Sequence, residues 1–117
     1  MQTRARHDIR DYGAVPNDES FKAEMLNQAA FEIAIEAANA TESMSDREVY
    51  VPGNMTFNMF PIDSSNLYNL TITIDGTVRM SKRHHAYPLD ERNKTKHMLL
   101  FTECHNFTIR GNGTVDG

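Results

Sequence analysis

A repeat with a spacing of 37 residues constrains the fold of this chain more than any other feature. Asn69-Leu70-Thr71-Ile72 recurs as Asn106-Phe107-Thr108-Ile109, and Gly76-Thr77-Val78 recurs as Gly113-Thr114-Val115. Apolar and polar residues alternate in each copy, which predicts strands separated by turns rich in glycine and asparagine. Self-similarity at a fixed spacing is typical of stacked units, so we expect strands from successive units to lie side by side.

The chain before the repeat predicts a short strand near residues 7–14, a helix, and further strands from residue 48 onward. Asp18 or Ser20 can cap the helix, and apolar residues recur after them at three- and four-residue spacing. We expect Ile33 and Ala34, with Phe31 or Ala30, to face the strands of the first stacked unit, and Glu32 and Glu36 to face solvent. The helix would then cover the open end of the stack.

The composition of the chain limits the classes of function that it can have. The chain has 117 residues, of which 39% are hydrophobic and 24% charged, as in an ordinary soluble domain. No apolar run is long enough for a membrane span, and the polar start lacks the apolar core of a signal peptide. A net charge of −4 argues against general nucleic-acid binding. Cys104 is the single cysteine, so an internal disulfide is excluded.

Several segments match a known family in one consistent order. They are Asp11-Tyr12-Gly13-Ala14, residues 30–38, Val49-Tyr50-Val51-Pro52, Pro61-Ile62, Asp75-Gly76-Thr77-Val78, Tyr87-Pro88, Leu99-Leu100-Phe101 and residues 106–117. Together they resemble the pectin-lyase-like superfamily and, within it, the polygalacturonases of glycoside hydrolase family 28. The resemblance implies an all-β fold, a right-handed parallel β-helix with an N-terminal capping α-helix. Residues 1–117 would form the N-terminal part of one domain, with the cap helix at about 20–39 and coils at about 47–117.

The resemblance also implies an activity, the hydrolysis of α-1,4-galacturonosyl bonds in pectin by an extracellular, monomeric enzyme without a cofactor. Its partner would be an anionic plant or algal polysaccharide. The family carries its catalytic aspartates on an Asn-Thr-Asp motif and an Asp-Asp pair, with a Gly-His-Gly histidine and an Arg-x-Lys clamp. This chain has none of the first three, and Arg92-Asn93-Lys94 matches the fourth by letters alone. We therefore assign no catalytic residue here and expect those motifs beyond Gly117.

Two alternatives stay open at this point. One is a non-catalytic β-helix protein that binds polysaccharide, of the adhesin or tailspike type. The other is a pectate lyase, whose calcium-binding carboxylates would also lie farther along the chain.

A basic segment is the main candidate for a binding surface. Residues 79–97 contain six Lys and Arg against two acids, although the chain as a whole is acidic. Lys82, Arg83 and Lys94 are therefore candidate contacts for a polyanion, and a solvated loop is the alternative interpretation. Five histidines raise the question of metal, but His84-His85 and the others lack ligand spacing, so we expect no metal site.

Six Asn-x-Ser/Thr sequons occur, more than chance predicts for this composition. Asn69 and Asn106 are explained by the corner-to-strand pattern of the repeat. Asn39, Asn54 and Asn93 are the better candidates for N-glycosylation, which would fit a secreted protein.

Overall fold

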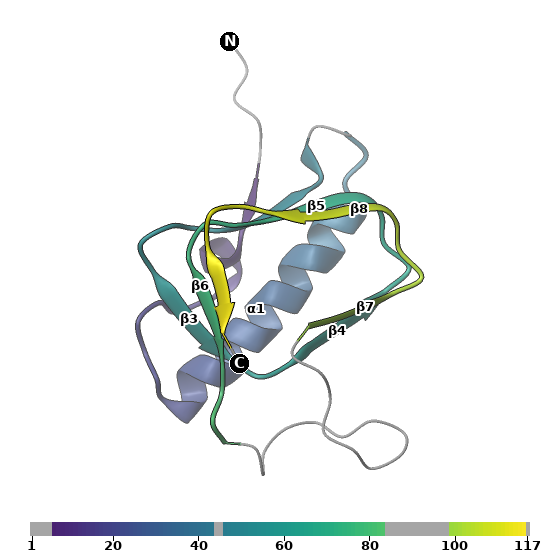
Figure 1. Ribbon diagram of the computed structural model, residues 1–117. Helices are drawn as coiled ribbons and strands as arrows, with labels where there is room; N and C mark the ends of the chain where they lie inside the picture. The colour runs from purple at the N-terminus through teal and green to yellow at the C-terminus, as the bar shows by residue number, and fades with distance from the viewer. Residues whose placement is uncertain (1–5, 44–45, 84–98, 117) are drawn as a thin grey trace, which may run out of the picture.

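The computed structural model describes residues 6–43, 46–83 and 99–116 (Figure 1). The described chain forms one α-helix, one short 3-10 helix and nine strands. In chain order these are β1 (His7–Asp8), η1 (Ile9–Tyr12), α1 (Phe21–Asn39), β2 (Glu48–Val51), β3 (Thr56–Met59), β4 (Ile62–Ser65), β5 (Tyr68–Ile74), β6 (Thr77–Met80), β7 (Leu99–Thr102), β8 (His105–Arg110) and β9 (Thr114–Asp116).

The strands form three separate sheets, and every pairing within them is parallel. Their orders are β1-β2-β5-β8, β3-β6-β9 and β4-β7. The repeated segments lie side by side with their equivalent residues paired, Leu70 with Phe107 and Val78 with Val115. In Figure 1 the three sheets lie on three sides of the molecule. The 37-residue spacing therefore predicted which strands are neighbours.

The predicted fold class is wrong. We expected an all-β chain, a right-handed parallel β-helix with a capping helix, whereas the structure is a small α/β domain with three parallel sheets and one helix. The 19-residue helix α1 is part of the hydrophobic core rather than an addition to its end. One repeat indicates which strands pair through backbone hydrogen bonds. It does not indicate that the paired strands continue into a β-helix.

Helix α1 packs small residues against the sheets. Ser20 caps its N-terminus, because the Ser20 hydroxyl accepts a hydrogen bond from the Ala23 amide at 3.1 Å. The buried face contains Ala30, Phe31, Ala34, Ile35 and Ala38, none more than 1% exposed.

Ile33 does not belong to that buried face. We expected it to face the sheet with Ala34, but its side chain is 47% exposed. The helix carries two apolar stripes, and the one with more alanine is buried because small side chains let the helix approach the strands closely. The described residues include no helix long and apolar enough to cross a membrane.

Asparagines occupy the corners between strands. Asn54, Asn66, Asn69 and Asn106 have φ between 51° and 61°, the left-handed region. Asparagine adopts this conformation more readily than other residues with a side chain, because its short amide can bond locally. The recurring corner asparagines of the repeat therefore have a backbone reason.

Candidate functional site

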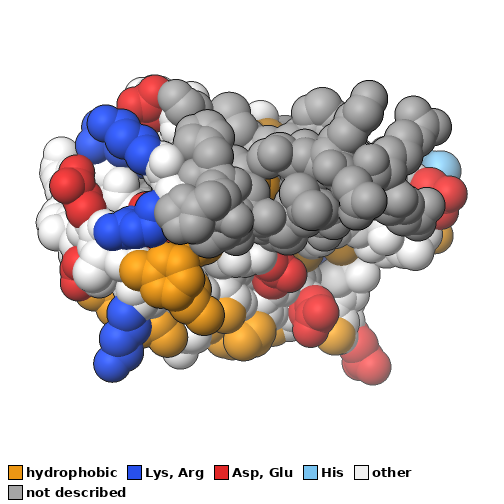
Figure 2. All heavy atoms as spheres, turned by 90° about the horizontal axis from the view of Figure 1, so that it is seen from below, with side chains coloured by type: hydrophobic (Ala, Val, Ile, Leu, Met, Phe, Trp, Pro, Cys, Tyr) orange, Lys and Arg blue, Asp and Glu red, His pale blue; other side chains and the backbone are white. Residues whose placement is uncertain are grey.

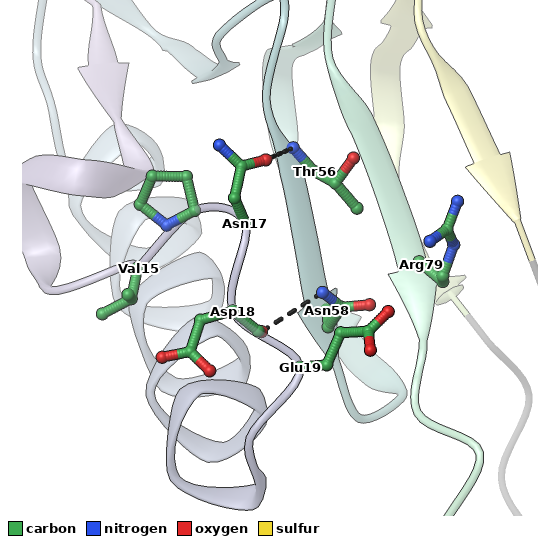
Figure 3. Close-up of a pocket in the computed structure, with 8 residues that line it drawn as sticks. Val15, Asn17, Asp18, Glu19, Thr56, Asn58 and Arg79 are labelled. Atoms are coloured by element: carbon green, nitrogen blue, oxygen red, sulfur yellow. Dashed lines mark hydrogen bonds between the residues drawn. The ribbon is translucent and has the colours of Figure 1, made fainter.

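Two neighbouring cavities beside strands β3 and β6 form the candidate site. Their volumes are about 620 Å³ and about 540 Å³, and they share Glu19, Asn58 and Arg79. Together we call them the polar cleft. Figure 3 shows the first cavity, in which Asn58 of β3 and Arg79 of β6 lie across from the loop of residues 15–19. Lys82, Arg83, Glu24 and Asp116 line the second.

The loop that borders the polar cleft is bound along the edge of β3. The Asn17 amide donates to the Thr56 carbonyl at 2.7 Å, and the Asn17 side-chain oxygen accepts from the Thr56 amide at 3.0 Å. Farther along, the Asn58 side-chain nitrogen donates to the Asp18 carbonyl at 3.2 Å (Figure 3). These bonds set the width of the cleft, since they fix the loop to the strand on its floor.

Asn27 of helix α1 holds the same loop from behind. Its side-chain oxygen accepts from the Val15 amide at 2.6 Å, and its nitrogen donates to the carbonyls of Val15 at 3.2 Å and Asn58 at 2.7 Å. Asn27 is fully buried. A buried side-chain amide that satisfies three backbone groups joins helix, loop and strand at one point.

We expect Asn27→Ala to lower the free energy of unfolding by about 2–3 kcal/mol, because three backbone groups in buried or half-buried positions lose their partner. A urea melt followed by circular dichroism measures the change. Gln28→Ala is the matched control, since Gln28 is half-buried on the same helix and its amide donates to Glu32 at 3.1 Å. Similar losses for the two variants would contradict the role of Asn27.

The polar cleft contains charged side chains of both signs. Arg83 pairs with Glu24, which is only 3% exposed, and also donates to the Glu19 carbonyl at 3.2 Å. Arg79 lies 3.3 Å from Asp116 on the adjacent strand β9, with both side chains exposed. Figure 2 shows Lys and Arg next to Asp and Glu on this side of the molecule. The local charge is therefore balanced rather than strongly basic.

The two ion pairs differ in how easily they exchange partners. Glu24 is buried, so removing Arg83 from it would leave a carboxylate in a poorly solvated position. The exposed Arg79–Asp116 pair is worth about 0–1 kcal/mol, as for surface pairs in general. Arg79 can consequently change from Asp116 to a ligand carboxylate at little cost.

Asp18 at the mouth of the polar cleft is held as an anion. The backbone amide of Ser20 donates to its carboxylate at 2.8 Å and, with the Ser20 hydroxyl, lowers the pKa of Asp18. Its folded pKa lies below its unfolded value, so its contribution to stability is present above the unfolded value and is lost as pH falls through the folded one. Ionised Asp18 is a hydrogen-bond acceptor, not a proton donor, near neutral pH.

The predicted basic contacts are only partly placed by the structure. Lys82 and Arg83 both line the second cavity, whereas Lys94 lies outside the described residues. Sequence reasoning did not single out Asn17, Asn58 or Arg79. Arg79 could have been found from strand alternation, since Val78 and Met80 on either side are buried. A buried asparagine within Phe57-Asn58-Met59 carries no such periodic signal.

The three sequons selected from the sequence differ in their surroundings. Asn39 ends helix α1, and its side-chain oxygen accepts from Arg47 at 2.8 Å and from the Tyr68 amide at 3.2 Å. Asn54 is exposed in the turn before β3. Asn93 lies outside the described residues.

A second charged cluster surrounds Glu48 on strand β2. Glu48 is fully buried, accepts a hydrogen bond from the Thr73 hydroxyl, and lies 3.1 Å from Arg6 and 3.8 Å from Arg110. These partners come from the segment before β1 and from β5 and β8, so the cluster joins β2 to two other strands of its sheet and to the segment that leads into β1. It lines neither cavity of the cleft, and we interpret it as structural.

Comparisons of the chain with protein-family models, with curated proteins and with solved structures gave no match.

Proposed function

We propose that this chain is a segment of a polysaccharide-degrading glycoside hydrolase of the polygalacturonase type, and that its polar cleft contacts the polymer. The sequence resemblance to that family supports the type of reaction. The observation that supports this contact is the wall that the two cavities share, where Asn58 and Arg79 are paired on neighbouring strands. Amide and guanidinium groups are suited to the hydroxyls and carboxylates of a uronic-acid chain.

Arg79 is the residue to which we assign the carboxylate of the sugar. The Arg79 side chain is 42% exposed, and among the described residues its ion-pair partner is the exposed Asp116. A planar guanidinium binds a carboxylate through two parallel hydrogen bonds, which a lysine cannot do. Binding exchanges one carboxylate partner for another, so the gain is modest, and selectivity for uronates over neutral sugars follows from charge.

Bond cleavage is assigned to carboxylates that the described residues do not supply. An inverting glycosidase needs an acid and a base about 6.5–9.5 Å apart with room for a water. Of the four carboxylates in the described part of the polar cleft, Glu24 is bound to Arg83, Asp116 to Arg79, and Asp18 to Ser20, so Glu19 lacks the second carboxylate that an acid–base pair needs. These contacts hold loops and strands in place, so we give none of the three a part in proton transfer.

Calorimetric titration with trigalacturonate tests the contact. We expect Arg79→Ala to weaken binding about three- to tenfold, the equivalent of one net hydrogen bond of about 0.6–1.4 kcal/mol. Arg10→Ala is matched in charge, because Arg10 is also exposed and paired with an acid, Asp8, but lines neither cavity. Equal weakening by both variants would show a general charge effect and would contradict the assignment.

A reducing-end assay on polygalacturonate tests whether this chain binds the polymer without cleaving it. The 117-residue chain alone is expected to bind the polymer and release no reducing ends. Release of reducing ends that tracks the purified chain, and persists after further purification, would show that cleavage does not need carboxylates from elsewhere.

A further inference from the structure

The structure separates the sequons into those whose asparagine side chain makes a hydrogen bond within the described residues and those whose side chain makes none there. Five of the six lie in the described residues. Three of these have side-chain amides engaged in hydrogen bonds. Asn39 binds Arg47 and Tyr68 and also donates to the Asn66 carbonyl at 3.4 Å, and Asn106 donates to the side chain of Asn69 at 2.8 Å.

The remaining two sequons, at Asn54 and Asn112, occupy the same corner of the molecule. Thr56, Thr77 and Thr114 pair in register at the starts of β3, β6 and β9, and each asparagine lies two residues before its threonine. Both asparagines are exposed, as Asn69 and Asn106 also are, so the two groups differ in hydrogen bonding rather than in exposure. In residues 6–43, 46–83 and 99–116, no hydrogen bond holds either side-chain amide, although the Asn112 backbone donates to Asp75 at 3.2 Å.

A group attached at this corner can extend into solvent, because the backbone contacts of the corner lie on its inner side. The backbone of Thr56 is bound to Asn17, and Gly113 lies so close to the Gly76 carbonyl that an added Cβ would be 2.0 Å from its oxygen. The close contact of Gly113 is therefore with the backbone of Gly76, just before β6. The side chains of Asn54 and Asn112, by contrast, are exposed.

We propose that Asn54 and Asn112 carry N-linked glycans, and that Asn39, Asn69 and Asn106 do not. The donor is an oligosaccharide linked to a lipid pyrophosphate, which the secretory pathway of a eukaryotic cell supplies. The side-chain nitrogen of asparagine forms a bond to the anomeric carbon of the sugar and loses one proton. The bond from that carbon to the pyrophosphate oxygen breaks, and the lipid pyrophosphate leaves with the electron pair. The hydroxyl residue two positions later completes the acceptor motif.

A glycan on Asn39 would conflict with the end of helix α1. Arg47 donates to the carbonyls of Asn39 and Thr41, each at 2.7 Å, as well as to the Asn39 side chain. These bonds satisfy helix-end carbonyls that have no partner inside the helix. An attached sugar would compete for the space of Arg47 and Asn66, so chains modified there should fold poorly and be retained in the cell.

The test is expression of the full 117-residue chain behind an added secretion leader in a eukaryotic host. Glycopeptide mass spectrometry is applied to both the secreted and the cell-associated protein. We expect glycans at Asn54 and Asn112 in the secreted pool. Asn54→Gln and Asn112→Gln should each remove one glycan, and Thr56→Ala should do the same as Asn54→Gln.

Thr56→Ser is the matched control, because it keeps both the acceptor motif and the backbone contact with Asn17. It should retain the glycan. Secreted or cell-associated protein without sugar at Asn54 and Asn112 would overturn the proposal. So would secreted protein modified mainly at Asn39, Asn69 or Asn106.

Discussion

Phe31→Ala should lower the free energy of unfolding by about 3–5 kcal/mol, the usual cost of removing a large buried ring. Phe31 is fully buried in the core shared by helix α1 and the sheets, together with Phe57, Val49 and Leu70. The surrounding strands are held by backbone ladders and cannot collapse fully into the space left by the ring. A denaturant melt of the variant beside the native chain measures this loss.

Ile33→Ala is the control that separates the buried face from the helix itself. It lies two positions from Phe31 but is 47% exposed, so we expect a change within about 0.5 kcal/mol. If Ile33→Ala and Phe31→Ala were equally destabilising, the placement of α1 against the sheets would be contradicted.

The second large effect is expected at Gly76. A Cβ built there would lie 2.1 Å from the Pro52 carbonyl oxygen and 2.7 Å from that of Met55. Both are backbone atoms, so a side-chain rotation cannot relieve the overlap. Gly76→Ala should therefore force the chain apart where β6 begins, at a cost of about 2–4 kcal/mol.

Gly53→Ala provides the comparison at the same corner. A Cβ on Gly53 would meet its nearest atom, the Asp75 carbonyl oxygen, at 3.6 Å, which is ordinary van der Waals contact. We expect it to change stability by less than about 1 kcal/mol. A thermal melt in which Gly76→Ala unfolds no earlier than Gly53→Ala would show that the close approach of these turns does not limit stability.

The repeat was the most informative feature of the sequence, whereas the fold that the family resemblance implied was the main error. The repeat correctly paired β5 with β8 and β6 with β9. Both copies show the same alternation of apolar and polar residues, so the sequence itself indicates which strands are hydrogen-bonded to each other. The repeat could not show how much of the core a helix supplies. Helical spacing predicted that Phe31 or Ala30 faces the strands, and Phe31 is indeed buried. The same spacing also placed Ile33 there, because the choice between the two stripes depends on packing against strands that come later in the sequence.

The candidate site was harder to predict than the strands. Asn27 and Asn58 are buried polar residues, so hydrophobic patterns pass over them, and their bonding joins positions 31 apart. Arg83 was recognised as a basic residue, but its partner Glu24 lies 59 positions earlier. A count of charge along residues 79–97 does not include acids such as Glu24, because those acids come from other elements.

Chemical-shift mapping of the isotope-labelled chain with trigalacturonate tests whether the polar cleft contacts the polysaccharide. We expect the backbone amide resonances of Asn17, Asn58 and Arg79 to move together as the ligand is added. Galactose, which lacks the carboxylate, should move them less at the same concentration. Shifts confined to the cluster around Glu48, or no saturable shifts at all, would contradict the assignment of the polar cleft as the polysaccharide contact.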